Sequence, residues 1–230
     1  MATYNGEKYV AAQLESILAS PLVGELLVSD DGSTDRTIEI VERFSDSRIK
    51  LLRGPRAGYG RNFEYLLTQA QGEYIFFSDQ DDIWLPEKIG LMAAQLQHAD
   101  LVMSDCVVVD QDLKVLHPSY FALIDSRPGL LKNLAKNSYL GCCMALRRRL
   151  LAHILPLPRH LPYHDWWAGM VAEAFGTVTF LNVALMQYRR HAEALTPSGA
   201  RRSRAPLTRR LRHRILMAWY LLLRRVGRGT

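Results

Sequence analysis

Three carboxylates crowd into one short segment, where Asp79, Asp81 and Asp82 stand within four residues. Like charges this close repel one another, and the repulsion is tolerated when the segment is solvated or when a cation lies among the carboxylates. Carboxylate oxygens suit Mg²⁺ or Mn²⁺, and such ions commonly bridge one or two carboxylates to the phosphates of a substrate. A solvated acidic turn is the alternative. The apolar run at residues 74–77 and Trp84 on the other side favour a metal-dependent binding site.

A second acidic pair, Asp30 and Asp31, follows another apolar run. The polar residues 33–35 come next, and residues of these types cap helices, so capping explains part of this motif. Capping does not explain both aspartates. The polar segment 3–6 precedes a predicted helix, and the N-terminus of a helix can bind phosphate. These two segments are therefore further candidates for a phosphate-containing ligand.

Short apolar runs alternate with helical patterns along the first 110 residues, which is typical of an α/β fold. Polar loops at residues 29–35, 54–60 and 78–84 each follow a predicted strand. Because ligands bind beyond the carboxyl ends of strands in open α/β sheets, we expect one site built from these loops. The predicted strands are residues 26–28, 49–52, 74–77, 101–103 and 107–109, and the predicted helices begin near residues 7, 38, 62 and 86.

The last third of the chain is less regular. Residues 125–190 are expected to cover the open edge of the sheet, with a strand-like stretch at 141–144 and a helix opening near Tyr163. From Thr196 the chain is rich in Pro, Ser, Gly and Arg, which predicts a linker over residues 196–206. Apolar residues then recur at helical spacing among arginines, so residues 207–230 are predicted to form a basic amphipathic helix.

The size and composition of the chain restrict its class. A length of 230 residues accommodates one large domain or two small ones. Hydrophobic residues make up 48% and charged residues 23%, which excludes wholesale disorder and a multi-span membrane protein. The three cysteines have neither a disulfide framework nor metal-ligand spacing, which favours a reducing compartment. We therefore expect an intracellular packed domain.

The formal net charge of +6 is concentrated in the tail. Ten arginines and no acidic residue follow residue 200, whereas residues 1–200 contain 19 basic and 23 acidic residues. An anionic membrane surface is the partner that a basic amphipathic helix favours, and packing against the domain or a partner protein is the alternative. Nucleic acid is not expected, because aromatic residues that could stack on bases are sparse in the tail.

Five short motifs follow one another along the chain, namely Ala2-Thr3-Tyr4-Asn5-Gly6, Val28-Ser29-Asp30-Asp31-Gly32-Ser33-Thr34-Asp35, Gly58-Tyr59-Gly60-Arg61-Asn62-Phe63, Ser78-Asp79-Gln80-Asp81-Asp82-Ile83-Trp84 and His164-Asp165-Trp166-Trp167. Their order and spacing resemble those of the family 2 glycosyltransferases, and their wording is closest to the rhamnosyltransferase-like bacterial branch. The resemblance covers about residues 2–195. Five ordered motifs are much more specific than any one of them.

The resemblance implies a GT-A fold, in which helices flank a doubly wound, mixed and mostly parallel sheet. Residues 1–195 would form the glycosyltransferase domain, with a nucleotide-sugar half at 1–110 and an acceptor half at 111–195. The implied reaction is an inverting transfer from a dTDP- or UDP-linked sugar, with rhamnose a guess from the motif wording. The implied acceptor is a glycan or a lipid-linked acceptor of bacterial surface polysaccharide. The expected location is the cytoplasm, peripherally on the inner face of the cell membrane.

On the donor side, the resemblance assigns roles to residues from three loops. Thr3 and Asn5, with Asp30 or Asp31, would hold the base and ribose. Asp79 would face the ribose as the first carboxylate of an Asp-x-Asp motif. Its second carboxylate, Asp81, would reach an Mg²⁺ or Mn²⁺ ion on the diphosphate, and such an ion neutralises the charge that develops on a departing nucleotide diphosphate.

On the acceptor side, Asp165 matches the catalytic base, which fits the need for a carboxylate to accept the proton of a weakly nucleophilic sugar hydroxyl. Gly141 lies in a segment resembling the loop near the acceptor, and Trp166 would stack on a sugar or belong to the core. His191, in an element that resembles Tyr-Arg-x-His, is a candidate for the diphosphate and metal. Arg61 is a candidate for the diphosphate. For both basic groups, pairing with surface acids is the alternative.

The chain departs from the family at its start. An apolar first strand normally precedes the Ala-Thr-Tyr-Asn segment, and Met1 stands where that strand should end. We therefore expect this strand to be missing, at a cost of several kcal/mol of burial, with a start assigned too late or a truncation as the cause. A nonenzymatic nucleotide-sugar or anion-binding membrane adaptor is the alternative function, and a metal-dependent phosphotransfer enzyme is a third.

Overall fold

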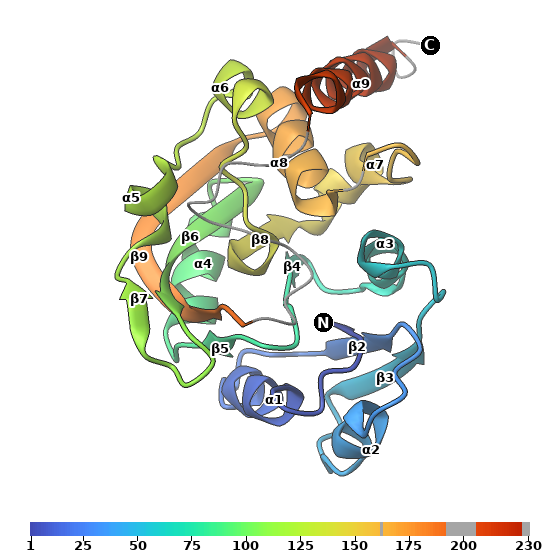
Figure 1. Cartoon of the computed structure of the whole chain (residues 1–230), viewed down its shortest axis with the longest axis vertical. Coiled ribbons are helices and arrows are strands. Elements are labelled where there is room, and N and C mark those ends of the chain that lie inside the picture. Colours follow the sequence, from blue (N-terminus) through green and yellow to red (C-terminus); the bar gives the residue numbers. More distant parts are fainter. Residues whose placement is uncertain (162, 192–205, 227–230) are drawn as a thin grey trace.

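The first sheet is a parallel one of three strands, in the order β1-β2-β3. The computed structural model describes residues 1–161, 163–191 and 206–226. Within it, β1 (Ala2–Thr3), β2 (Leu26–Asp30) and β3 (Ile49–Arg53) form the core of the lobe drawn in blue in Figure 1. β2 pairs with β3 along its full length, whereas β1 pairs only with the last two residues of β2. From the sequence we expect the first strand to be missing, whereas the structure has a short strand of two residues, β1, within the Ala-Thr-Tyr-Asn segment.

The second sheet has six strands, in the order β4-β8-β6-β9-β5, with β7 paired to β6. The predicted strands at 101–103 and 107–109 are a single strand, β6. Only β6 and β9 pair in parallel, because β8 runs antiparallel to β4 and β6, and β5 runs antiparallel to β9. The strands are β4 (Tyr74–Phe76), β5 (Ile83–Trp84), β6 (Leu101–Val109), β7 (Val115–His117), β8 (Met144–Arg147) and β9 (Val178–Arg189).

A mixed α/β architecture with flanking helices is thus confirmed, with a larger antiparallel share than the sequence predicts. Two of the four antiparallel pairings in this sheet involve β8, which follows a 3-10 turn, η1 (Gly141–Cys143), and pairs with both β4 and β6. An apolar run in a sequence indicates a buried strand but says nothing about its direction.

Helices cover both sheets, and their apolar faces are buried. In α1, for example, Val10, Leu14 and Ile17 follow helical spacing and are at most 1% exposed. One hydrophobic core runs from these residues through β6 to Trp167 of α8. The helices are α1 (Val10–Leu18), α2 (Thr37–Glu42), α3 (Tyr59–Gln69), α4 (Lys88–Leu96), α5 (Tyr120–Ile124), α6 (Leu130–Ala135), α7 (Leu151–Ile154), α8 (His164–Phe175) and α9 (Leu207–Val226), with a second 3-10 turn, η2 (Arg148–Leu150).

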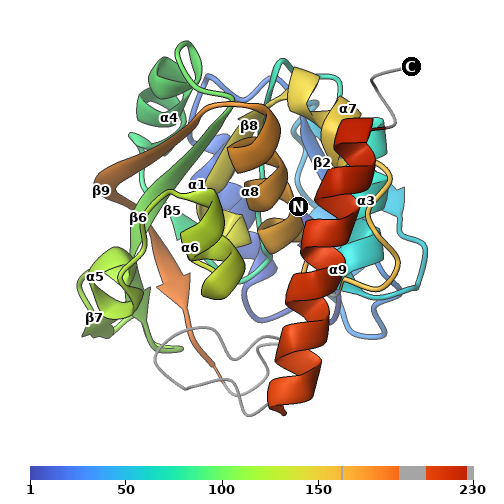
Figure 2. The same ribbon diagram turned by 90° about the horizontal axis from the view of Figure 1, so that it is seen from above.

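The basic tail forms α9, drawn in red beside α8 in Figure 2. It packs on α6 and α8 through one face, where Met217 and Leu221 are buried. Arg214 donates hydrogen bonds to the carbonyls of Leu134 and Ala135 at the end of α6. The predicted linker falls almost entirely outside the described residues, as do the last four residues of the tail. None of the described helices is long and apolar enough to cross a membrane.

Candidate active site

The acidic loop lies where the two sheets meet. It joins β4 to β5 and runs past the end of β1, whose Ala2 N–H donates to the carbonyl of Ser78 over 3.3 Å. The amide of Phe77 donates to Met144 of β8 over 3.1 Å, and that of Trp84 donates to the Ser16 hydroxyl over 3.0 Å. These hydrogen bonds fix both ends of the loop that carries Asp79, Asp81 and Asp82.

Asp81 points toward the end of β9. Its Oδ2 lies 2.7 Å from Nε2 of His191, which is 110 residues away in the sequence. The His191 side chain is 6% exposed, its Nδ1 has no hydrogen-bond partner within the described chain, and its ring lies 4.8 Å from that of Tyr9. Arg189 fixes the backbone here, because its Nε donates to the Asp81 carbonyl over 2.8 Å. The two predicted metal ligands are thus brought together.

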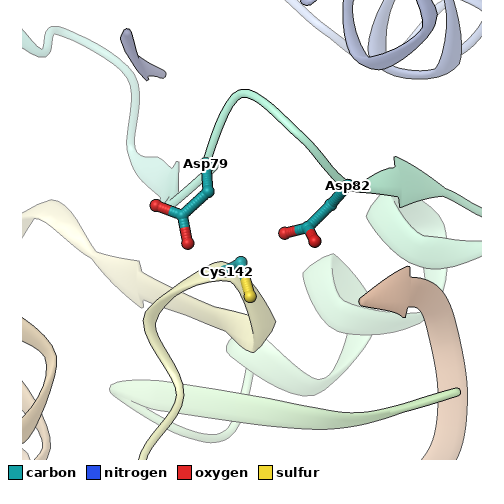
Figure 3. A group of neighbouring side chains, drawn as sticks. All are labelled: Asp79, Asp82 and Cys142. Carbon is teal, nitrogen blue, oxygen red and sulfur yellow. The ribbon is translucent and has the colours of Figure 1, made fainter. Parts of the chain in front are cut away.

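Asp79 and Asp82 point to the other side of the loop, toward Cys142 of η1 (Figure 3). Burial, and then the charges of Asp81 and Asp165, raise the pKa of Asp79 to about 7. Burial, and then the charges of Asp81 and Asp79, raise the pKa of Asp82 well above its ordinary value. Unfavourable ionisation of neighbouring carboxylates is what a bound cation would relieve. The crowded carboxylates of Asp79, Asp81 and Asp82 therefore fit a site for a divalent cation.

Asp165 lies in the first turn of α8, on the acceptor side of the predicted site. Its Oδ1 accepts a hydrogen bond from the Trp166 amide over 2.7 Å, and burial raises its pKa to about 6. Its charge contributes to the raised pKa of Asp79, which places the two carboxyl groups in one electrostatic environment. A carboxyl group of this kind is ionised at neutral pH but retains enough basicity to accept a proton.

Gly141 makes room for these side chains. A Cβ on this residue would lie 3.4 Å from Cβ of Asp165 and 3.2 Å from Nε2 of His164. The imidazole of His164 stacks on Phe63 with ring centroids 4.0 Å apart, and burial lowers its pKa to about 3. The histidine beside Asp165 is therefore neutral and packed.

The loops after β1 and β2 hold each other through the predicted donor residues. Asp30 is 5% exposed and accepts hydrogen bonds from the amides of Gly32 and Ser33, the Ser33 hydroxyl and the Thr3 hydroxyl. The Thr3 side chain is 2% exposed and also donates to the Ser29 carbonyl. Both groups therefore hold the loops in place in this structure.

Asn5 and Asp31 are more accessible. Asn5 has a positive φ of 48°, and its Oδ1 accepts from the Thr34 amide over 2.8 Å. The Asp31 carboxylate accepts from the amides of Arg56 and Gly58 at 2.7 and 2.8 Å. Asp31 thereby holds the loop that opens α3, where Gly58 takes the positive φ of 87° that glycine tolerates.

Arg61 and Trp166 are engaged elsewhere. Arg61 pairs with Glu64 and donates to the Leu157 carbonyl over 3.2 Å, so its charge is already matched by an acid. Trp166 is 7% exposed, and its indole donates to the Asn133 carbonyl over 2.9 Å, which favours the core alternative.

A pocket of about 280 Å³ adjoins Arg61 and His164. Its other lining residues are Ala57, Gly58, Tyr59, Gly60, Leu157, Pro158, Arg159 and Leu161.

Two residues that sequence analysis did not single out position the site. Gln80 bridges the acidic loop to the first loop, accepting from the Tyr4 amide at 2.8 Å and donating to the Tyr4 carbonyl at 2.9 Å. A Cβ on Gly6 would overlap the Gln80 side chain. Lys88 is fully buried, and its ammonium donates to the Cys142 carbonyl over 2.9 Å. Gln80 is part of the acidic motif at residues 78–84. The contact of Lys88 with Cys142 is visible only in the fold, because 54 residues separate the two in the sequence.

The chain is similar to known proteins over much of its length. The family model described as Glycosyl transferase family 2 matches residues 1–155, a range that ends before Asp165 and His191. The chain is 44% identical over 98 residues to dTDP-rhamnosyl transferase RfbG of Shigella flexneri, covering 39% of this chain and 34% of that protein. It is 40% identical over 98 residues to the UDP-Glc:alpha-D-GlcNAc-diphosphoundecaprenol beta-1,3-glucosyltransferase WfgD of Escherichia coli, covering 42% and 39%.

A solved structure matches over a longer stretch. The structure of S. aureus TarS residues 1–349 in complex with UDP aligns with 82% of this chain and 59% of that chain, at 25% identity and a TM-score of 0.66. The GT-A fold implied by the motifs is therefore confirmed. The chain spans between about a third and two fifths of the length of the first two curated relatives, so their complete activities do not transfer directly.

Proposed function

Because the chain belongs to glycosyl transferase family 2, we propose that it transfers a sugar from a nucleotide diphosphate, dTDP- or UDP-linked, to a hydroxyl group of an acceptor with inversion at the anomeric carbon. The observation that carries this proposal is the convergence of Asp81 and His191 on one side of the acidic loop with Asp165 near the other. A binding module would not need a half-buried carboxyl group whose pKa is raised to about 6.

Asp81 and His191 would hold the divalent cation, Mg²⁺ or Mn²⁺. When bound, the cation supplies positive charge to the diphosphate leaving group. Arg189 keeps the Asp81 backbone in place, and Asp79 lies on the same loop, where its partly exposed carboxylate faces the ribose in our proposal. The raised pKa of Asp79 indicates that a nearby positive charge would stabilise its ionised form.

Asp165 would act as the general base. It accepts the proton of the acceptor hydroxyl as that oxygen attacks the anomeric carbon from the side opposite the nucleotide. Burial strengthens the basicity of the carboxylate, and the amide of Trp166 orients Oδ1. Gly141 leaves space beside Asp165 in which the acceptor can approach.

The remaining donor contacts are proposed from the loops after β1 and β2. Asn5 and Asp31 offer partly accessible polar groups to the base and ribose, while Thr3 and Asp30 hold the loop that carries them. Relatives of the chain are named as using dTDP-rhamnose or UDP-glucose, and the TarS structure contains UDP. These names support a dTDP- or UDP-linked donor for this chain.

A lipid-linked acceptor is supported by WfgD, whose name gives a diphosphoundecaprenol acceptor, and by the outer face of α9. That face exposes an apolar stripe, and no acidic residue occurs on the helix. Exposed apolar residues with neighbouring arginines suit the interface of an anionic membrane. We propose peripheral binding through this stripe at the cytoplasmic membrane surface. The stripe consists of Leu211, Ile215, Trp219, Leu222, Leu223 and Val226.

The experiment that tests the function is a transfer assay with the full chain and Mn²⁺. dTDP-rhamnose, UDP-glucose and UDP-GlcNAc are offered with a lipid-linked diphosphate sugar, and release of the nucleotide diphosphate is followed. NMR of the product reports the anomeric configuration. We expect turnover with one donor and inversion of configuration. Nucleotide binding without turnover for every donor would support the membrane adaptor instead.

A further inference from the structure

Cys142 joins Asp79 and Asp82 in a cluster of three possible metal ligands, of which the proposed function uses Asp79 alone. One ligand atom from each of the three residues lies within 4.8 Å of the other two. Asp82 and Cys142 are each 1% exposed, whereas Asp79 is partly exposed, so the cluster is reached from the solvent past Asp79. Figure 3 shows the Asp79 and Asp82 side chains, both from the acidic loop, next to Cys142 of η1.

The two carboxylates differ in how they are satisfied. Oδ1 of Asp82 accepts a hydrogen bond from the Arg189 amide over 3.0 Å. Oδ2 accepts none within the described part of the chain, although the Cys142 thiol is close enough to favour the charged form of Asp82. A buried carboxylate oxygen without a partner is costly unless a ligand occupies the space that it faces. This orphaned oxygen is the observation that points to a ligand.

The backbone holds the cluster in place from both sides. The β4–β8 pairing sets η1 opposite the acidic loop, and the Lys88 ammonium fixes the Cys142 carbonyl at 2.9 Å. Asp81 on the same loop turns the opposite way, toward His191. The loop therefore presents two separate donor sets, one of oxygen and nitrogen at Asp81 and one of oxygen and sulfur at Asp82.

The donor types distinguish the ions that each set prefers. A thiolate with two carboxylates favours Zn²⁺ or Cd²⁺, whereas Mg²⁺ requires oxygen ligands in octahedral geometry. Tetrahedral zinc has Zn–O and Zn–S bonds of about 2.1 and 2.3 Å, which places its ligand atoms roughly 3.5 Å apart. The ligand atoms of the cluster lie within 4.8 Å of one another, so side-chain movements of about 1 Å would bring them to this spacing. Binding would release the thiol proton to solvent, because the thiolate is the ligand form.

We propose that Asp79, Asp82 and Cys142 form a site for a thiophilic divalent cation, Zn²⁺ or Cd²⁺, whose occupation removes Asp79 from the donor and inhibits the enzyme. The inhibitory consequence rests on the proposed function, whereas the binding of the cation does not.

Cd²⁺ alone is the probe, because a cadmium thiolate absorbs in the ultraviolet. The full chain, without nucleotide or Mn²⁺, is titrated with Cd²⁺, and the absorbance is compared for wild type, Cys142→Ser and Asp82→Asn. Cys143→Ser is the matched control, since Cys143 is the neighbouring buried thiol outside the cluster. We expect one bound Cd²⁺ with a thiolate band in wild type and in the control, no band in Cys142→Ser, and at least tenfold weaker binding in Asp82→Asn.

A second readout separates this inference from the proposed function. One equivalent of Zn²⁺ should weaken Mn²⁺-dependent UDP binding at least tenfold in wild type but not in Cys142→Ser. A folded wild type without a cadmium band, or a band that survives in Cys142→Ser at wild-type affinity, overturns the site even if UDP binds. A cadmium band in a protein that binds no nucleotide upholds the site and overturns the proposed function.

Discussion

Replacing Asp165 by Asn should abolish transfer and, at the same time, stabilise the fold. Asparagine keeps the size of the side chain and can still accept the Trp166 amide bond, but it cannot take a proton. General-base catalysis typically contributes about 10²–10⁴-fold to the rate, so kcat should fall by that factor. Binding of the nucleotide should remain, because Asp165 is not part of the proposed donor contacts.

The gain in stability follows from the raised pKa of Asp165. Burial raises that pKa from 3.8 to about 6, so the folded state holds this proton more tightly than the unfolded chain does. The resulting destabilisation is absent below pH 3.8, grows as the pH rises through this window and is complete above pH 6. At 1.36 kcal/mol per pKa unit, the ionised carboxylate costs the fold about 3 kcal/mol at pH 7.5. The Asn variant avoids this cost.

Urea unfolding of both proteins across pH 4.5 to 7.5 measures the stability, and nucleotide diphosphate release measures the activity. The stability difference should shrink as the pH falls below 6, where wild-type Asp165 becomes protonated. In the same range the transfer rate of wild type should fall, approaching tenfold for each pH unit. An Asn variant that retains full kcat, or that is less stable than wild type at pH 7.5, would refute the assignment of Asp165 as a half-buried general base.

Two further predictions concern packing and the tail. A Cβ on Gly169 of α8 would overlap the ring of the buried Tyr139, so Gly169→Ala should lower the free energy of unfolding by about 1–3 kcal/mol, as measured by thermal melts. Gly24→Ala is the control and should be neutral, because a Cβ there meets nothing within 4 Å. Replacing Ile215 and Trp219 together by Ser should abolish sedimentation with anionic vesicles at low salt without lowering the melting temperature, because both side chains are more than half exposed. Unchanged sedimentation would exclude the stripe as a membrane contact.

The site loops could be predicted from the sequence because each of them follows a short apolar run whose end is easy to locate. The acidic segment does lie beyond the end of β4, and the second acidic pair lies at the end of β2. The proximity of Asp81 and His191 had no support from spacing, since 110 residues separate them, and it followed from a motif resemblance alone. Local physics can identify a strand end, but pairing over such distances depends on the whole sheet.

The remaining differences have physical causes that no local pattern contains. The three cysteines have no ligand spacing in the sequence, yet the fold brings Cys106 of β6 next to the buried thiols of Cys142 and Cys143 in η1. For Trp166 the sequence leaves sugar stacking and the core as alternatives, and its position on α8 directs it into the core. Direction around a helix is set by packing, and a motif does not record which face the core requires.

Calorimetric titration of UDP and dTDP, with and without Mn²⁺, tests the central claim most directly. Wild type, Asp81→Ala and Glu42→Ala are compared, the last removing an exposed acid on α2. We expect one nucleotide to bind only with Mn²⁺, equally well to wild type and Glu42→Ala, and at least tenfold more weakly to Asp81→Ala. Metal-independent binding that is equal in all three proteins would contradict the metal site at Asp81 and His191, and with it the proposed transfer.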